Sequence, residues 1–200
     1  MKVTKQFNDV SSSTYYSTAV DALANYGYTT GSGASREFHA TPVVNGNTST
    51  TYNPAGPVTR GQFVAMMYNK ALADYKKNGG TDPSTAAASS FTDVNASAYY
   101  AAAVNWATAN GIAKGKDSST FDPNGTVTRA EAVTFLQRWL GGTDSSSSQF
   151  TDVTGSSYYA GAVGWAVKNG VTEGTTTTTF SPIRNCNRAQ AAAFIYRAAF

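Results

Sequence analysis

Three segments of the chain repeat the same order of short motifs, and this repeat constrains the fold more than any other feature. Each unit opens with Phe-x-Asp-Val and an adjacent pair of tyrosines, and it ends with a helix start that contains an arginine. The interval from Asp to Arg is 36 residues in the second and third units, while the first unit is about 15 residues longer. Repeats of this period form arrays in which each unit completes its core against its neighbours. The sequence therefore predicts three copies of one structural unit.

Each unit has the pattern of two helices joined by a loop. In the second unit Tyr100, Ala103, Val104 and Ala107 follow helical spacing, and Gly111 stands where a left-handed residue would end the helix. A loop with Asp, Asn, Pro and Gly turn chemistry comes next. The second helix has a broad apolar arc, which indicates burial against several neighbours. The pattern predicts an all-α fold.

The second helix of each unit begins with a capping box. Thr128 and Glu131 form it in the second unit, and the equivalent pairs are Thr59 with Gln62 and Asn187 with Gln190. The first helical residue is then an arginine in all three units: Arg60, Arg129 and Arg188. A cation there faces the positive end of the helix dipole, which costs about 0.3 to 1 kcal/mol. An anion bound by the arginine and the free helix amides would remove that cost.

The units are separated by small, polar linkers. They divide the chain into residues 1–80, 81–142 and 143–200, with linkers at 81–90 and 143–149 and an insertion in the first unit at 31–52. Units of this size bury little core alone, so we expect one co-folded domain. The Asn45-Gly46 pair predicts that the insertion is a surface loop or a small hairpin.

Composition excludes several functional classes. The net charge of +3 is too small for a nucleic-acid-binding face, and no apolar run is long enough to insert into a membrane. The single Cys186 and single His39 offer no metal cage or catalytic dyad, and no nucleotide-cofactor motif is present. We expect no cofactor, no metal and no catalytic residues. The first 25 residues have no signal-peptide core.

These motifs resemble the S-layer homology family of bacterial surface proteins. Phe-x-Asp-Val, the tyrosine pair, the glycines, the aromatic-x-Pro turn and the Thr-Arg-Ala-Glu start occur in order three times. The resemblance implies a pseudo-threefold, three-lobed spindle with a central bundle of three helices. It also implies a non-catalytic module that anchors a surface-layer protein to the cell wall outside the bacterium. The partner would be an anionic, ketal-pyruvate-bearing wall polysaccharide, with other surface-layer subunits reached through the rest of the protein.

The resemblance places ligand binding in grooves between the lobes. The binding arginine of the family corresponds to Arg60, Arg129 and Arg188. The candidate ligand contacts beside them are the cap residues, two tryptophans of the first helices and the second loop glycine of each unit: Thr59, Thr128, Asn187, Trp106, Trp165, Gly31, Gly115 and Gly174. One tyrosine of each pair could stack on a sugar. Asp9, Asp93 and Asp152 are expected to cap the loop that enters the first helix.

The motif departs from the family in two units. Gln62 and Gln190 replace the glutamate and Asn187 replaces the threonine, which predicts that the first and third grooves differ in affinity or do not bind. If Arg129 is a ligand residue, Arg129→Ala should leave stability unchanged or slightly raised. If it is a structural ion-pair partner, the same change should lower stability. Two alternatives remain: a self-assembly module whose arginines only join the lobes, and part of a wall-active hydrolase.

Overall fold

The protein is a helical array with the expected helix starts. The computed structural model describes residues 7–26, 28–29, 38–39, 42–145 and 149–200. Its first helices are α1 (Ser17–Asn25), α3 (Ala101–Ala109) and α5 (Ala160–Lys168), and its second helices are α2 (Arg60–Asn78), α4 (Arg129–Trp139) and α6 (Arg188–Ala199). A 3-10 turn, η1 (Pro83–Thr85), follows α2. The antiparallel strands β1 (Tyr28–Thr29) and β2 (Phe38–His39) are a minor addition to an all-α fold.

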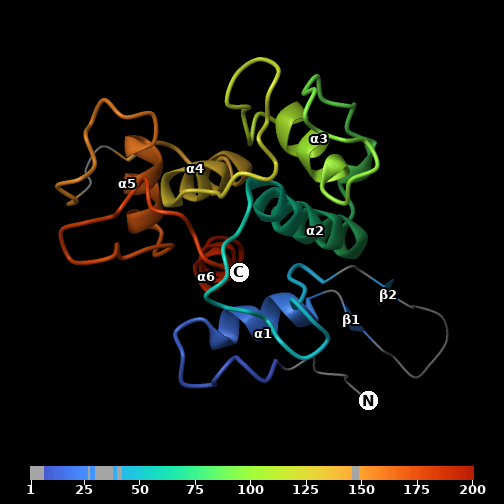
Figure 1. Cartoon of the computed structure of the whole chain (residues 1–200), viewed down its shortest axis with the longest axis horizontal. Helices are drawn as coiled ribbons and strands as arrows, with labels where there is room; N and C mark the ends of the chain where they lie inside the picture. The colour runs from blue at the N-terminus through green and yellow to red at the C-terminus, as the bar shows by residue number, and fades with distance from the viewer. Residues whose placement is uncertain (1–6, 27, 30–37, 40–41, 146–148) are drawn as a thin grey trace.

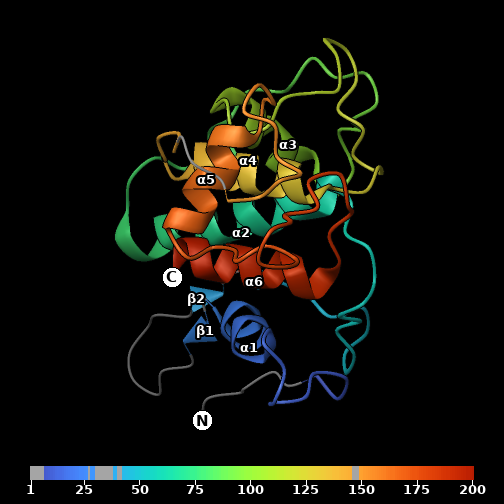
Figure 2. The ribbon, with the colours of Figure 1, turned by 90° about the vertical axis from the view of Figure 1, so that its left-hand side faces the viewer.

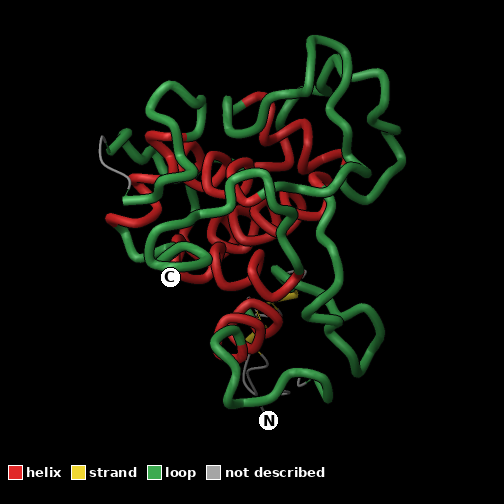
Figure 3. Tube along the Cα trace, turned by 60° about the vertical axis from the view of Figure 1, so that its left-hand side comes forward, coloured by secondary structure: helices red, strands yellow, loops and turns green. Residues whose placement is uncertain are grey.

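The second helices form the centre of a three-lobed spindle. In Figure 1, α2, α4 and α6 meet near the middle and the shorter helices lie outside them, while Figure 3 shows the loops at the periphery. The main helix pairs are α2 with α3, α4 with α5, and α6 with α1. Each lobe therefore combines the second helix of one repeat with the first helix of the next. Figure 2 shows the closing pair, with α1 beside α6.

Backbone hydrogen bonds join the three repeats into a ring. The first amide of each second helix donates to a carbonyl in the turn of the next repeat: Arg60 to Gly125 at 2.8 Å, Arg129 to Arg184 at 2.9 Å and Arg188 to Gly56 at 2.9 Å. Isolated β-bridges flank these contacts. The third repeat thus bonds back to the first, and the threefold arrangement closes on itself.

The core is continuous through all three lobes. The aromatic residue before each turn is fully buried, as its position in the repeat predicts: Tyr52, Phe121 and Phe180 are each 0% exposed. Each one packs on the phenylalanine that opens its own repeat, at ring-centroid distances of 5.4, 5.5 and 5.8 Å. This aromatic pair pins the start of each repeat to its own turn.

The repeated aspartates hold these turns and do not cap the first helices. The Asp93 carboxylate accepts the amides of Phe121 at 2.8 Å and Asp122 at 2.7 Å, and Asp9 and Asp152 bind the equivalent amides of their repeats. Asp122 has a positive φ of 61°. The carboxylate therefore fixes a strained turn, and the expectation of a helix-entry cap was wrong.

The insertion of the first repeat lies earlier than the sequence spacing suggested. Val43 and Val44 are each 1% exposed, so this part of the segment 31–52 belongs to the core and is not a surface loop. The described hairpin pairs β1 with β2, and the Asn45-Gly46 pair is not its turn. Gly46 packs like Gly115 and Gly174, because a Cβ on any of the three would meet the opening phenylalanine at 2.4 to 2.5 Å. Gly46, rather than Gly31, is the second loop glycine of the first repeat.

This correction predicts a stability effect. Val43→Ala should lower the free energy of unfolding by about 2 kcal/mol, because it removes buried methyl groups and leaves a cavity. Ser49→Ala changes an exposed residue of the same segment and should shift it by less than about 0.5 kcal/mol. Urea unfolding of both variants measures the difference. Equal midpoints would mean that this segment is peripheral after all.

None of the helices within the described residues has the length and apolar character that crossing a bilayer requires.

Candidate functional site

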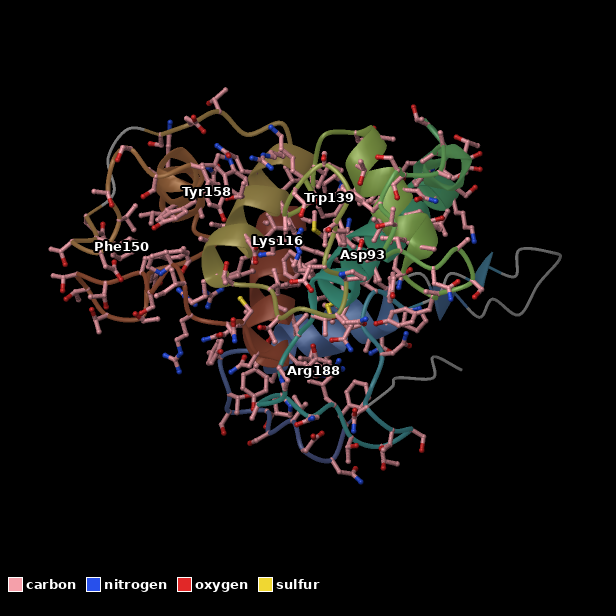
Figure 4. The ribbon with its side chains drawn as sticks, turned by 45° about the horizontal axis from the view of Figure 1, so that its top comes forward. Asp93, Lys116, Trp139, Phe150, Tyr158 and Arg188 are labelled. Atoms are coloured by element: carbon pink, nitrogen blue, oxygen red, sulfur yellow. The ribbon has the colours of Figure 1, made fainter. Side chains whose placement is uncertain are left out.

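The three arginines lie buried between repeats. Arg60 and Arg129 are each 2% exposed and Arg188 is 9% exposed. Each begins a second helix, and each guanidinium extends toward the loop of the next repeat. Figure 4 labels Arg188 where the start of α6 meets the segment that precedes α2. The arginines therefore mark three equivalent sites at the junctions of the repeats.

One set of contacts is common to all three sites. Nε of Arg60, Arg129 and Arg188 donates to the backbone oxygen of Phe121, Phe180 and Tyr52, at 2.9, 2.7 and 2.7 Å. The guanidinium carbon also lies over the ring of the same residue, at 4.7, 4.7 and 4.4 Å from its centroid. Each arginine therefore joins two repeats in addition to any role in binding.

These contacts favour a loss of stability in Arg129→Ala even though Arg129 forms no ion pair with a described carboxylate. The substitution would leave the Phe180 carbonyl without its donor and a cavity beside the Phe180 ring. Both changes are destabilising. The variant should be less stable, and it is a poor probe of binding.

The helix amides are not free to bind an anion. The first and second amides of α4 donate to Arg184 O and Pro182 O, and the third donates to the capping oxygen of Thr128. The same pattern holds in α2 and α6, where Thr59 and Asn187 are the caps. The proposed contribution of helix amides to an anion site was therefore wrong. The three capping boxes themselves are confirmed.

The Arg60 site contains its own carboxylate. Nη1 of Arg60 lies 2.7 Å from Oε1 of Glu131, and Nζ of Lys116 lies 2.6 Å from the same oxygen. Burial alone would raise the pKa of Glu131, but hydrogen bonds from Lys116 and the Thr128 amide, with the charge of Arg60, hold it below its usual value. This glutamate belongs to the next repeat, not to the repeat of Arg60. Sequence reasoning treated it as part of its own motif and missed this pairing.

The Arg129 site has no such carboxylate. Gln190 occupies the position of Glu131 in the third repeat, and within the described part of the chain no acidic side chain pairs with Arg129. Nη2 makes a long, 3.5 Å contact with Thr172 Oγ1. Burial lowers the pKa of Arg129, because a low-dielectric environment disfavours the charged guanidinium. An anion would stabilise it there.

A groove of about 380 Å³ opens beside Arg129. Its walls come from all three repeats: Tyr15 from the first, Arg129 from the second, and residues of the third, which include Thr172, Gly174, Arg184, Gln190, Phe194 and Arg197. The groove therefore exists only when the repeats are assembled as a ring.

One tyrosine of each pair lies at these sites. Tyr15, Tyr99 and Tyr158 are 60, 69 and 67% exposed. Tyr15 lines the Arg129 groove. Tyr99 is close enough to Arg188, and Tyr158 to Glu131 and Arg60, for these charges to act on the tyrosine hydroxyls. Each first tyrosine is thus the exposed member, while its neighbour packs on the core.

The tryptophans are placed elsewhere. Trp106 is 6% exposed and Trp165 is 8% exposed. Trp106 packs against Trp139 with a centroid distance of 6.0 Å, and it lines a pocket at the far ends of the second helices. Neither indole lines the Arg129 groove. The apolar environment of both rings identifies them as core residues.

The glycines have a packing role. A Cβ on Gly115 or Gly174 would meet a phenylalanine ring and backbone oxygens at 2.4 to 2.7 Å. Gly174 also lines the groove, while Gly31 lies outside the described residues.

Sequence reasoning missed two further groove residues, Arg184 and Arg197. Neither belongs to the motifs that the three repeats share.

Comparisons with known proteins agree with this geometry. Residues 43–64, 90–133 and 149–192 match the S-layer homology domain, and they make up more than half of the chain. The chain therefore belongs to the S-layer homology family, whose domains anchor surface proteins to the cell wall.

Similar sequences occur within much longer proteins. A cell surface protein of Thermoanaerobacter kivui is 37% identical over 56% of this chain, and a surface-layer 125 kDa protein of Lysinibacillus sphaericus is 32% identical over 54%. An amylopullulanase of Thermoanaerobacterium thermosulfurigenes is 30% identical over 77%. The matches span 16, 9 and 8% of these relatives. The S-layer homology domain is a non-catalytic module, and the enzymatic parts of such relatives lie elsewhere in them.

Proposed function

We propose that the chain binds an anionic wall polysaccharide in the Arg129 groove and at the equivalent Arg188 site, with a ketal-pyruvate carboxylate as the charged group. The observation that carries this proposal is the buried Arg129 guanidinium, which lines an open groove and has no carboxylate partner among the described residues. A planar carboxylate matches the donor geometry of guanidinium. The binding would attach a surface-layer or other surface protein to the cell wall.

The Arg188 site supports the same role. Its Nε and Nη2 donate to the backbone oxygens of Tyr52 and Asn45, and Gln62 stands at the position of Glu131. No described carboxylate pairs with Arg188. Tyr99 lies nearby with an exposed ring, and such rings stack on sugar faces at wet interfaces.

The Arg60 groove should bind least. Glu131 already occupies the guanidinium edge that a ligand carboxylate would need. This ranking reverses the expectation from the motif, in which the two units with glutamine were the weakened ones. The residue three positions after each capping residue lies at the arginine of the preceding repeat and not at the arginine of its own repeat. Glu131 therefore weakens the Arg60 site, while Gln190 and Gln62 stand at the Arg129 and Arg188 sites.

Matched exchanges at this position test the proposal. Gln190→Glu and Gln62→Glu each place a carboxylate where the chain already tolerates Glu131, so the fold should persist. The double variant should sediment with purified cell walls about tenfold less well or worse, since a charged hydrogen bond is worth about 1.5 to 3 kcal/mol. Glu131→Gln should not weaken binding. Unchanged binding by the folded double variant would contradict the proposal.

Two further measurements identify the ligand and separate the alternatives. Soluble wall polysaccharide should compete with sedimentation, and chemical removal of its pyruvate should abolish the competition. Arg129→Lys with Arg188→Lys should also weaken binding, because lysine keeps the charge but loses the planar fork. Concentration-dependent assembly without any polysaccharide binding would favour the self-assembly alternative, and release of reducing sugar would favour a hydrolase.

A further inference from the structure

We infer that Arg184 and Arg197 make the Arg129 groove select a glycan with two neighbouring negative groups, a carboxylate at Arg129 and a second carboxylate or phosphate beside it. This inference rests on the proposed function, since it assumes that the groove binds an anionic glycan. It concerns two arginines that the repeat motif does not contain. Both line the groove together with Arg129.

The third turn has room for the Arg184 side chain, whereas the other two turns have glycine at this position. The equivalent residues are Gly56 and Gly125, and a Cβ there would lie 2.5 Å from Asn53 Nδ2 and 2.0 Å from Asp122 Oδ2. The third repeat has the shorter Ser181 in place of Asn53 and Asp122. The space below the turn is therefore open, and position 184 can hold a side chain.

The fold holds the backbone of Arg184 against the backbone of the binding arginine. The carbonyl oxygen of Arg184 accepts the amide of Arg129 at 2.9 Å. Arg184 is exposed, and its charge adds to burial in lowering the pKa of Arg129. The two like charges therefore repel each other, and an anion bound in the groove would relieve that repulsion.

Arg197 supplies a third cation to the groove. It lies on α6, at the position that Asn69 occupies in α2, and its charge acts on the groove residue Tyr15. Glu173 is the acidic side chain among the groove residues. Three guanidinium groups against one carboxylate leave excess positive charge, and a single ligand carboxylate at Arg129 does not use the outer two arginines.

Two probes distinguish one-charge from two-charge recognition. The first is a hexose with one ketal-pyruvate, and the second is the same hexose linked to glucuronic acid, which adds a second carboxylate. The full chain should bind the second probe about tenfold more tightly by calorimetry, in line with one charge-assisted contact. Raised salt should reduce this preference, because the outer arginines are exposed.

Natural counterparts in the other repeats supply the variants. Arg184→Gly reproduces Gly56 and Gly125, and Arg197→Asn reproduces Asn69. Each should remove most of the preference for the two-charge probe, where the preference is the ratio of the two affinities measured on the same variant. Arg138→Asn, at the corresponding position of α4 and outside this groove, is the control and should keep the preference.

The outcomes separate this inference from the proposed function. Equal binding of both probes by the unaltered chain, or an unchanged preference in Arg184→Gly and Arg197→Asn, would overturn the inference and leave the groove as a one-charge site. The proposed function fails together with this inference if neither probe binds the unaltered chain and the double variant Gln190→Glu, Gln62→Glu still sediments with cell walls.

Discussion

Ending the chain after Gly142 should abolish cooperative folding instead of shortening the protein by one independent unit. The first helix of the first repeat packs on the last helix of the third, so a chain of residues 1–142 lacks the partner of α1. Leu23 and Val20 on α1 are 0% exposed in the intact fold. Their exposure, with that of the other apolar residues facing the third repeat, would cost more than the about 5 to 15 kcal/mol that stabilises a typical domain.

The same truncation removes polar partners from the second repeat. Arg129 would lose the Phe180 carbonyl and the Thr172 hydroxyl, and the first two amides of α4 would lose their acceptors. Circular dichroism should show a broad, non-cooperative melt for residues 1–142. A sharp transition would show that two repeats are enough for a stable core.

A cleaved but complete chain is the matched control. A protease site inserted between Gly79 and Gly80 interrupts an exposed linker, where both glycines have open space around them. After cleavage the two pieces should remain associated and melt cooperatively, because the ring contacts do not depend on this peptide bond. Dissociation of the pieces would mean that the covalent link holds the repeats together.

Local chemistry explains which parts of the fold the sequence could predict. The second helices begin where Thr59, Thr128 and Asn187 cap them, because a capping box depends only on residues three apart. Gly111 and Gly170 end the first helices with φ of 65° and 69°, as expected. Which helices pack together is a different matter, because the pairing of α1 with α6 leaves no trace in local spacing.

The error in the first repeat had a signal that could have corrected it. The second loop glycine of the first repeat was assigned to Gly31 by counting forward from Asp9. This count fails because the insertion shifts every equivalent position that follows it. The pair Val43-Val44 before Gly46 corresponds to Ile112-Ala113 before Gly115 and to Val171-Thr172 before Gly174. Alignment from the arginine backward would have found Gly46.

The burial of the arginines could not be read from the sequence. Their partners are backbone oxygens of the next repeat, and every residue type supplies such an oxygen. The sequence indicated that the charge of each arginine needs a partner. The structure shows that backbone oxygens of the next repeat supply part of that stabilisation.

Arg60→Ala should produce the largest loss of stability among single substitutions at the three sites. It leaves the Glu131 carboxylate, which is 9% exposed, without its partner in the preceding repeat. Lys116 still pairs with Glu131 in this variant, so the loss should lie near the lower end of the about 3 to 5 kcal/mol that breaking a buried pair from one side costs. The Phe121 and Lys114 carbonyls also lose their donor. Urea unfolding measures the loss.

Glu131→Gln should be milder and should change the pH dependence. Glutamine serves as the capping partner at Gln62 and Gln190, so the fold accepts it, and we expect a loss of about 1 to 3 kcal/mol at neutral pH. The folded-state pKa of Glu131 lies below its usual value of 4.5. The contribution of its charge is therefore fully present above about pH 4.5 and is lost as the pH falls through the lowered value.

The difference between the unaltered chain and Glu131→Gln should therefore shrink on acidification. Unfolding free energies measured at pH 7, 5, 4 and 3 test this, and Ser49→Ala provides the control because it changes an exposed, uncharged residue. A double-mutant cycle with Arg60→Ala isolates the pairwise energy. A difference that stays constant down to pH 3 would show that the charge of Glu131 does not stabilise the junction between the first and second repeats.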